Sequence, residues 1–313
     1  MKILLYNTYH NGDLFFNQSI VRTLCKKNPN HSFTVVCRYN SYIFSEIQNL
    51  TISHDVQEFI SRESNLYFVI DNETIAINIW IGALFMNPAI TNTTLPDLEC
   101  NMSGYVKAFQ SVLFHIHHEL DIKIEVDEYD TMTYMPIIPK TDMSLFQDWY
   151  HNRDTTRTYV FYYNYLPKSG QYIPIQNHDV FVFELANIYP HHTFLIPTIS
   201  PELEMKLHES DIKNVIDCYK QFGLHENITC DNLCALEHIL QVCDYSIHFD
   251  IGACFYYLNQ SSITSKNTII HVGKDSYYYD NMYTNYSDFL KHKWTFLQAD
   301  DAAGVHLKLK DIL

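Results

Sequence analysis

The stretch up to residue 37 alternates between the pattern of a buried strand and that of a helix, and this alternation constrains the fold most. Lys2–Asn7 (KILLYN) is a short apolar run suited to a buried parallel strand. After a polar turn, apolar residues recur at helical spacing from Leu14 to Cys25. Pro29 ends that helix, and Ser32–Cys37 (SFTVVC) forms the next strand. Such a strand–helix–strand unit builds a parallel sheet.

The same alternation begins again near Thr156, after an unlike middle region. A chain of 313 residues also suits two domains. We therefore expect two α/β domains, at 1–155 and 156–290, with 291–313 packing back on the first. The expected elements are strands at 65–70, 75–81, 158–163, 193–196, 245–248 and 268–272, helices at 103–120, 179–188, 212–222, 233–242 and 253–258, and an extended connection at 122–140.

The charge of the chain argues against polyanionic partners. Lys plus Arg number 21 and Asp plus Glu number 36, which gives a net charge of −15. A chain this acidic has no broad positive field for a phosphate backbone, so we expect no nucleic-acid partner. A small anion such as a nucleotide diphosphate needs only a local site. The longest apolar run, Ile75–Met86, is too short to span a bilayer and no signal-peptide core precedes it, so we expect a cytoplasmic protein without an integral membrane segment.

The cysteines and histidines are interpreted as structural. The eight cysteines are scattered, and Cys230 and Cys234 lack the spacing of a metal knuckle, so we expect reduced thiols in the core. His117 and His118 are adjacent and cannot share a helix face. We expect no metal site and no cofactor.

Residues 1 to 37 resemble the start of the family nine glycosyltransferases, the heptosyltransferases. That family opens with a strand, a loop ending in Gly-Asp, an apolar helix, a Pro-containing turn and a second strand. Here Gly12-Asp13 ends the loop and Asn28-Pro29 forms the turn. Ser19 is a departure, since the family often has Pro there. The resemblance implies the GT-B fold, in which two Rossmann-like domains face a cleft.

The resemblance implies a catalytic role for Asp13. It stands at a helix start beyond a strand, where open α/β sheets bind ligands. The family's aspartate deprotonates the acceptor hydroxyl, and His10, Asn11 and Gly12 would form the acceptor-side loop. An aspartate there that merely caps the helix would look the same in the sequence.

The second half resembles the family's donor-binding segments. The run from Cys243 to Phe255 looks like the loop that leads from a strand into Asp-Ser/Thr-Gly-x-x-His and a helix. Asp250 and Gly252 match, whereas Ile251 and Phe255 replace the usual hydroxyl residue and histidine. The glycine turn at a helix start still favours a diphosphate.

A loop after the expected strand at 158–163 completes the implied donor site. The family places a hydroxyl residue and a lysine here to hold donor phosphate. Lys168 and Ser169 are the corresponding candidates, and we include the neighbouring Asn164 and, from the other strand, His248.

The resemblance thus implies an inverting, metal-independent transfer of a sugar from a nucleotide-diphosphate sugar to a hydroxyl group of a carbohydrate acceptor. Two alternatives stay open. The departures at Ile251 and Phe255 also suit a catalytically silent GT-B binding or structural protein. Asp71-Asn72-Glu73 mimics the Asp-x-Asp motif of metal-dependent GT-A glycosyltransferases, although a polar hairpin turn explains it as simply.

Overall fold

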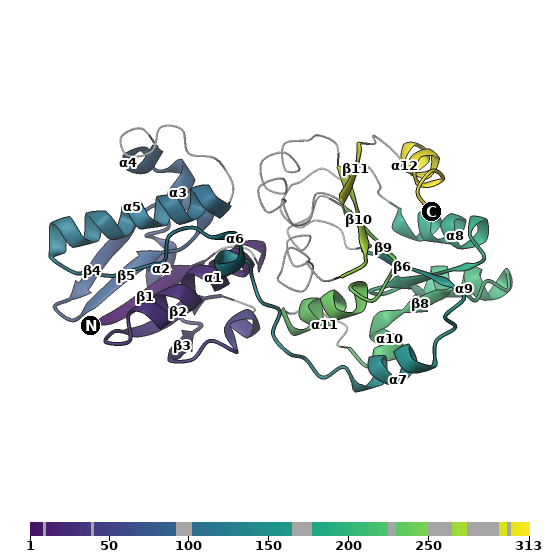
Figure 1. The fold of residues 1–313 in the computed structure, drawn as a ribbon, viewed down its shortest axis with the longest axis horizontal. Helices are drawn as coiled ribbons and strands as arrows, with labels where there is room; N and C mark the ends of the chain where they lie inside the picture. Colours follow the sequence, from purple (N-terminus) through teal and green to yellow (C-terminus); the bar gives the residue numbers. More distant parts are fainter. Residues whose placement is uncertain are drawn as a thin grey trace. The chain divides into compact units, whose positions relative to one another are not determined.

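The computed structural model describes residues 1–8, 11–38, 41–91, 102–164, 177–224, 230–249, 265–273, 294–298 and 302–313. These residues form two compact units, each with its own sheet (Figure 1). The described residues of unit 1 lie within Met1–Pro139, and those of unit 2 begin at Lys140. None of the helices in these ranges is long and apolar enough to cross a membrane.

Unit 1 is built on a five-stranded sheet in the order β3-β2-β1-β5-β4, parallel except for β4. Its buried strands are apolar on both faces, as parallel strands covered by helices require. Its elements are β1 (Lys2–Asn7), α1 (Asn11–Lys27), β2 (Ser32–Cys37), the 3-10 turn η1 (Ser41–Phe44), β3 (Leu50–Ser53), α2 (Gln57–Ile60), β4 (Tyr67–Asp71), β5 (Thr74–Asn78), α3 (Ile81–Met86), α4 (Pro88–Thr91), α5 (Met102–Leu120) and α6 (Thr131–Tyr134).

Unit 2 is built on a six-stranded parallel sheet in the order β11-β10-β9-β6-β7-β8. Its elements are α7 (Ser144–Asn152), β6 (Thr158–Tyr162), α8 (His178–Ile188), β7 (His192–Ile196), α9 (Pro201–Glu209), β8 (Val215–Asp217), α10 (Cys218–Phe222), α11 (Cys230–Leu240), β9 (Tyr245–Phe249), β10 (Thr268–Gly273), β11 (Trp294–Gln298) and α12 (Ala302–Leu309). The expectation of two α/β units with largely parallel sheets is confirmed.

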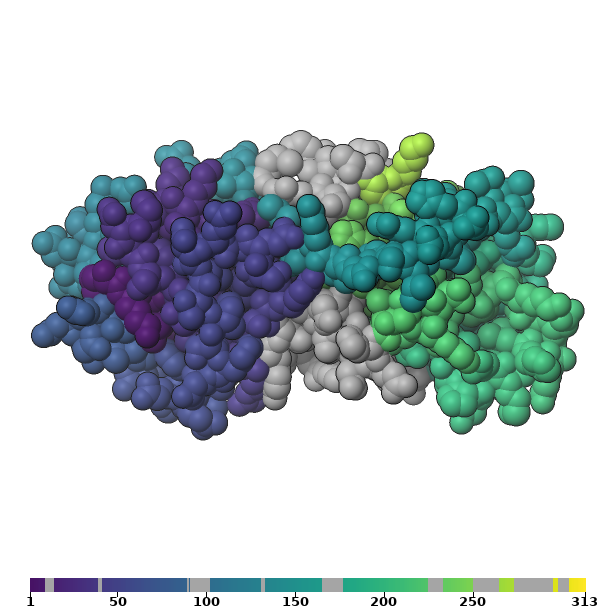
Figure 2. Space-filling model, turned by 90° about the horizontal axis from the view of Figure 1, so that it is seen from below, coloured from purple at the N-terminus to yellow at the C-terminus, as the bar shows by residue number. Residues whose placement is uncertain are grey.

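The unit boundary lies earlier than the expected 155/156, because α7 belongs to unit 2. Phe146 of α7 packs edge-on against Phe222, with ring centroids 5.2 Å apart, and Trp149 packs on Tyr159. The segment between α6 and α7, part of which is visible in teal in Figure 2, has no helix or strand and buries Met135, Ile138 and Met143. The connection expected at 122–140 is therefore mostly extended, and all but its last residue belongs to unit 1.

Two further expectations need correction. The helix expected at 212–222 is wrong in its first half, where Val215–Asp217 pairs with β7 as an edge strand. Its second half is α10, which Asp217 caps by accepting from the Lys220 amide at 2.9 Å. Residues 291–313 were expected on the first domain. Their described part instead adds β11 to the second sheet and sets His306 of α12 against Phe181, so it belongs to unit 2.

The thiols that the structure describes are reduced and buried, as predicted. They are Cys25, Cys37, Cys218, Cys234 and Cys243. Burial raises the pKa of Cys25 to about 11 and that of Cys37 to about 12, so both stay protonated at neutral pH.

Candidate functional site

The first sheet has its switch point at β1, which lies between β2 and β5. Ligands of open α/β sheets bind beyond the carboxyl ends of the strands at such a point. Strands β1 and β5 each end in a buried asparagine, Asn7 in β1 and Asn78 in β5. Polar groups at the ends of apolar strands need partners, and those partners define the site.

Asn17 of α1 joins the two strand ends. Its Oδ1 accepts a hydrogen bond from Nδ2 of Asn7 at 2.7 Å. Its own Nδ2 donates to the carbonyl oxygen of Ile79 and to the Tyr105 hydroxyl, both at 2.6 Å. The Tyr105 hydroxyl donates in turn to the Ile79 carbonyl at 2.7 Å. This buried network fixes the first half of α1 against the carboxyl edge of the sheet.

Asp13 lies in the first turn of α1, one helical turn before Asn17. Asn17 holds the next turn of the helix at the carboxyl edge of the sheet, so the first turn of α1 begins beside that edge. The helix begins at Asn11, earlier than the expected start at Leu14, so Asn11 and Gly12 belong to its first turn as well. His10 lies outside the described residues. Ser19, the departure from the family, donates from its hydroxyl to the carbonyl of Phe16 within an unbroken helix.

A second set of contacts ties this edge to the segment before β4. Thr8, the residue after β1, donates from its hydroxyl to Oε1 of Glu63 at 2.9 Å. Asn78 donates from Nδ2 to the Glu63 carbonyl at 2.8 Å and accepts from the Trp80 amide at 2.9 Å. Asn78 therefore holds the segments around Glu63 and Trp80 in fixed positions beside the end of β1.

A cavity of about 500 Å³ opens between these two segments. Its size is within the range of small-molecule sites, about 300–1,000 Å³. We call it the α2–α3 cavity. Sequence reasoning missed it, and the usable signal was the pair of asparagines that end apolar strands. It is lined by Ile60, Ser61, Glu63, Ser64, Trp80, Ala83, Met86, Asn87 and Pro88.

The second sheet has its switch point between β6 and β9. Its first strand, β6, lies between the second strand of the unit and the fourth, which is the order of the dinucleotide-binding Rossmann sheet. The expected donor-site residue Asn164 follows β6 at this edge of the sheet, and Asp250, which lies outside the described residues, comes directly after β9 in the sequence.

Among the residues expected to bind the nucleotide-sugar donor, Asn164 is the one that the structure describes at that edge. Its Nδ2 donates to the carbonyl oxygen of Thr198 at 2.7 Å and so joins the segments after β6 and β7. Its Oδ1 is buried and has no hydrogen-bond partner among the described residues. A buried acceptor of this kind at a switch point is a feature that a bound ligand can satisfy.

His248 sits differently from the expectation. It lies in β9 with 1% of its surface exposed, beside Phe161 and Tyr163, whose ring centroids are 6.1 and 6.0 Å away. Burial, together with the nearby His271, holds its pKa well below the ordinary value, so the ring is neutral. His248 is thus a core residue, and we do not retain it as a donor contact. Lys168, Ser169, Asp250, Ile251, Gly252 and Phe255 lie outside the described residues.

A second cavity in unit 2, of about 520 Å³, lies between α9 and the edge strand β8. It is lined by residues such as Glu204, Asp217 and Lys220. Because β8 is separated from β9 by two strands, this cavity is not at the switch point of the second sheet.

The alternative metal motif forms a hairpin turn. Asp71 and Thr74 flank the turn between β4 and β5, and Oδ1 of Asp71 accepts from the Glu73 amide at 2.8 Å. That hydrogen bond lowers the pKa of the Asp71 carboxyl. In the part of the chain that the structure describes, no three His, Cys, Asp or Glu side chains are grouped so as to hold a metal ion.

Comparison with protein-family models and with curated proteins gives no match. Among solved structures, the chain is similar to Escherichia coli heptosyltransferase WaaC with ADP, at 11% identity over 99% of this chain and 97% of that chain, with a TM-score of 0.46. It is also similar to a family 9 glycosyl transferase from Veillonella parvula, at 12% identity over 87% and 81%, with a TM-score of 0.44. A third is the Methanocaldococcus jannaschii UDP-GlcNAc 2-epimerase in complex with UDP-GlcNAc and UDP, at 9% identity over 100% and 93%, with a TM-score of 0.43. Likenesses at this level assign no activity to the chain.

Proposed function

We propose that the protein is a glycosyltransferase that moves a sugar from a nucleotide-diphosphate sugar to a hydroxyl group of a carbohydrate acceptor. The observation that carries this proposal is the position of Asp13, in the first turn of α1 beyond the carboxyl end of β1. The strand, Gly-Asp, helix and Pro-turn order around it is that of the family nine glycosyltransferases. Proteins to which the chain is similar are described with ADP or UDP bound.

In the proposed reaction, Asp13 accepts the proton of the acceptor hydroxyl. The hydroxyl oxygen forms a bond to the anomeric carbon of the donor, while the bond from that carbon to the diphosphate oxygen breaks. Attack from the opposite face inverts the anomeric centre. A positioned base of this kind contributes about 10²–10⁴ in rate. The proposed reaction needs no metal.

Unit 2 would hold the donor at the β6/β9 switch point. Asn164 offers a buried acceptor there. Lys168 and Ser169 would stabilise the negative charge that develops on the leaving diphosphate, and the turn of Asp250 and Gly252 would offer amides at a helix start.

Binding of nucleotides tests the donor half of this proposal. We expect one nucleoside diphosphate of a panel (UDP, GDP, ADP, CDP, dTDP) to stabilise the protein by about 2.7 kcal/mol at 100 times its dissociation constant. Lys168→Ala and Asp250→Ala should weaken this effect. Lys213→Ala is the matched control, because Lys213 forms an exposed ion pair with Asp211. Absence of a shift with every nucleotide would favour a silent binding protein instead.

Chelation separates the proposed enzyme from the metal-dependent alternative. Transfer should proceed unchanged in EDTA, and Asp71→Asn should retain activity, because an asparagine Oδ1 can still accept from the Glu73 amide in the turn. Loss of activity on chelation, restored by a divalent cation, would support the alternative that uses Asp71 and Glu73.

A further inference from the structure

We propose that the α2–α3 cavity binds an uncharged, hydroxyl-rich sugar, which stacks on Trp80 and hydrogen-bonds to Glu63. The assignment as acceptor site rests on the proposed function, whereas sugar binding itself rests on the cavity alone. The cavity combines an aromatic ring with a few polar groups on an otherwise apolar wall, which is the usual composition of a small-molecule site.

Two contacts fix the position of Trp80, one through its backbone amide and one through its indole ring. Its amide donates to Oδ1 of Asn78 at 2.9 Å. Its indole lies directly against Gly82, where an added Cβ would come within 2.6 Å of Cε2 and 2.9 Å of Cη2. Only glycine leaves room for the ring in this position. A fixed indole in a cavity wall offers a flat surface whose electron-rich face attracts the C–H groups of a pyranose ring.

The polar groups of the cavity suit sugar hydroxyls. Glu63, Asn87, Ser61 and Ser64 supply carboxylate, amide and hydroxyl groups. Carboxylate oxygens accept up to about four hydrogen bonds, and Thr8 supplies one of them to Glu63. The Glu63 backbone is in turn fixed by Nδ2 of Asn78.

The charge of the lining selects against anionic sugars. Glu63 is the one charged residue among the described residues of the lining, and it is acidic. Arg62 precedes it in the chain, but its guanidinium lies over the ring of Phe68, 4.2 Å from the centroid, and is not part of the lining. A sugar phosphate or uronate would therefore meet a like charge, and the described lining residues include no cation that could compensate it.

The rim of the cavity is apolar and open. Met86 is 67% exposed and Ile60 is 37% exposed, and both belong to the lining. A ligand resting on these side chains would cover apolar surface that the folded protein otherwise leaves in water. The hydrogen bond between Thr8 and Glu63 links the cavity to the end of β1, the strand that precedes α1 in the chain.

The test measures binding of defined sugars to the full chain by saturation-transfer NMR and isothermal titration, without nucleotide. The probes are methyl β-D-glucopyranoside and N-acetylglucosamine, with glucuronate and glucose 6-phosphate as charged counterparts. We expect the neutral sugars to bind at least tenfold more tightly than their charged counterparts. Trp80→Ala and Gly82→Ala should each lower the affinity for the neutral sugars at least tenfold. Trp80→Phe, which keeps a ring, should lower this affinity less.

Trp149→Phe is the matched control, because Trp149 packs among Phe146, Tyr159 and Phe222 in unit 2. It should leave sugar affinity unchanged. Tighter binding of the charged sugars, no binding of either neutral sugar, or unchanged affinity in folded Trp80→Ala would overturn the proposal. The protein could also bind sugar in a way that depends on Trp80 while binding no nucleotide. That result would support the sugar site and contradict the proposed transfer reaction.

Discussion

Asn17 is completely buried, yet its amide makes three hydrogen bonds that join Asn7, Ile79 and Tyr105. The partners belong to β1, the segment after β5 and α5. A buried polar side chain is tolerated only when its hydrogen bonds are made, and here they connect three elements. The residue therefore stabilises the edge at which Asp13 lies.

Replacement of Asn17 by Ala should lower the free energy of unfolding by about 2–4 kcal/mol, because it removes three buried hydrogen bonds and leaves a cavity. Urea denaturation followed by far-UV circular dichroism measures the change. Asn152→Ala is the control: Asn152 is exposed at the end of α7 and bonds only locally, to the Asp148 carbonyl, so its loss should cost less than about 0.5 kcal/mol. Equal effects of the two substitutions would contradict the assigned network.

For individual residues, the sequence indicated candidate positions but did not reveal which residues they contact in the fold. Gly12-Asp13 could be picked out because both the strand before it and the helix after it have clear patterns. Trp80 and Glu63 could not, because they become neighbours only through the hydrogen bonds of Asn78, which lies 15 residues from Glu63. His248 lies in the strand in which it was predicted, but the sequence alone could not show that its ring is buried beside Phe161 and Tyr163.

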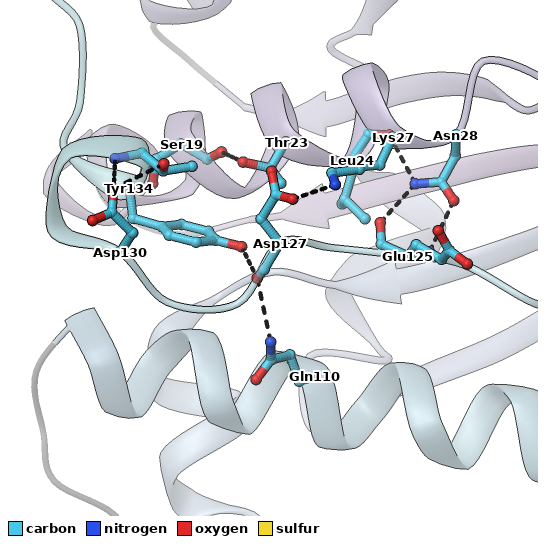
Figure 3. Close-up of polar contacts among 11 residues, drawn as sticks. Ser19, Thr23, Leu24, Lys27, Asn28, Gln110, Glu125, Asp127, Asp130 and Tyr134 are labelled. Atoms are coloured by element: carbon cyan, nitrogen blue, oxygen red, sulfur yellow. Dashed lines mark hydrogen bonds and ion pairs between the residues drawn. The ribbon is translucent and has the colours of Figure 1, made fainter.

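Helix α1 depends on the segment that follows α5 (Figure 3). Asn28, at the end of the helix, donates from Nδ2 to the carbonyls of Leu24 at 2.9 Å and Glu125 at 2.7 Å, and its Oδ1 accepts from the Glu125 amide at 2.8 Å. Lys27 pairs with Asp127 nearby, but both side chains are partly exposed. The extended segment thus acts as a structural part of unit 1.

Asn28→Ala should destabilise unit 1 by about 2 kcal/mol and increase amide hydrogen exchange at Glu125, because it removes both bonds to that residue. Lys27→Ala should cost less than about 1 kcal/mol, since exposed ion pairs contribute little. Hydrogen exchange with mass spectrometry measures both. If exchange at 123–127 is unchanged in Asn28→Ala, the segment is held by other contacts.

Helices and strands with a clear periodic pattern of apolar residues were predicted. Those that form only because they pair with a neighbouring strand were not. The helix at 103–120 and the strands at 2–7 and 32–37 match their observed bounds closely. The three-residue strand β8 carries no period of its own and exists because it pairs with β7. A short apolar run of this kind suits helix and strand equally.

Across the whole molecule, buried histidines make stability depend on pH. His178 is buried against Tyr162, with Nδ1 2.8 Å from the hydroxyl, and burial lowers its pKa to about 4. Burial also lowers the pKa of His248. Above the ordinary histidine pKa of about 6.5, both folded and unfolded chains leave these rings neutral. Below it, only the unfolded chain gains the proton, so stability is lost as the pH falls towards 4.

At pH 5 the loss from His178 alone should be about 2 kcal/mol relative to pH 7. Urea titrations at pH 7, 6 and 5 measure how steeply the free energy of unfolding changes with pH. His178→Gln should flatten it, whereas His151→Gln should not, because His151 is exposed on α7. A stability that stays level or increases as the pH falls would show that these rings gain protons in the folded chain.

The two-unit α/β organisation could be predicted because the strand–helix alternation occurs twice. The boundary at Pro139 could not, because α7 has an amphipathic pattern that suits either unit until Phe146 is seen packing on Phe222. The cavity beside Trp80 likewise depends on contacts between segments that the sequence does not reveal.

The most direct measurement of the central claim is the turnover of Asp13→Asn, compared with its affinity for donor nucleotide. Asp13 lies within the first turn of α1 and not at its N-cap, so the loss of its charge removes only a favourable interaction with the helix dipole, and stability should change by less than about 1 kcal/mol. A neutral amide cannot take the acceptor proton, so turnover should decrease at least ~10²-fold while nucleotide affinity stays within about twofold. Near-normal turnover, or activity lost only because the variant unfolds, would contradict the account and leave Asp13 with a structural role at the start of α1.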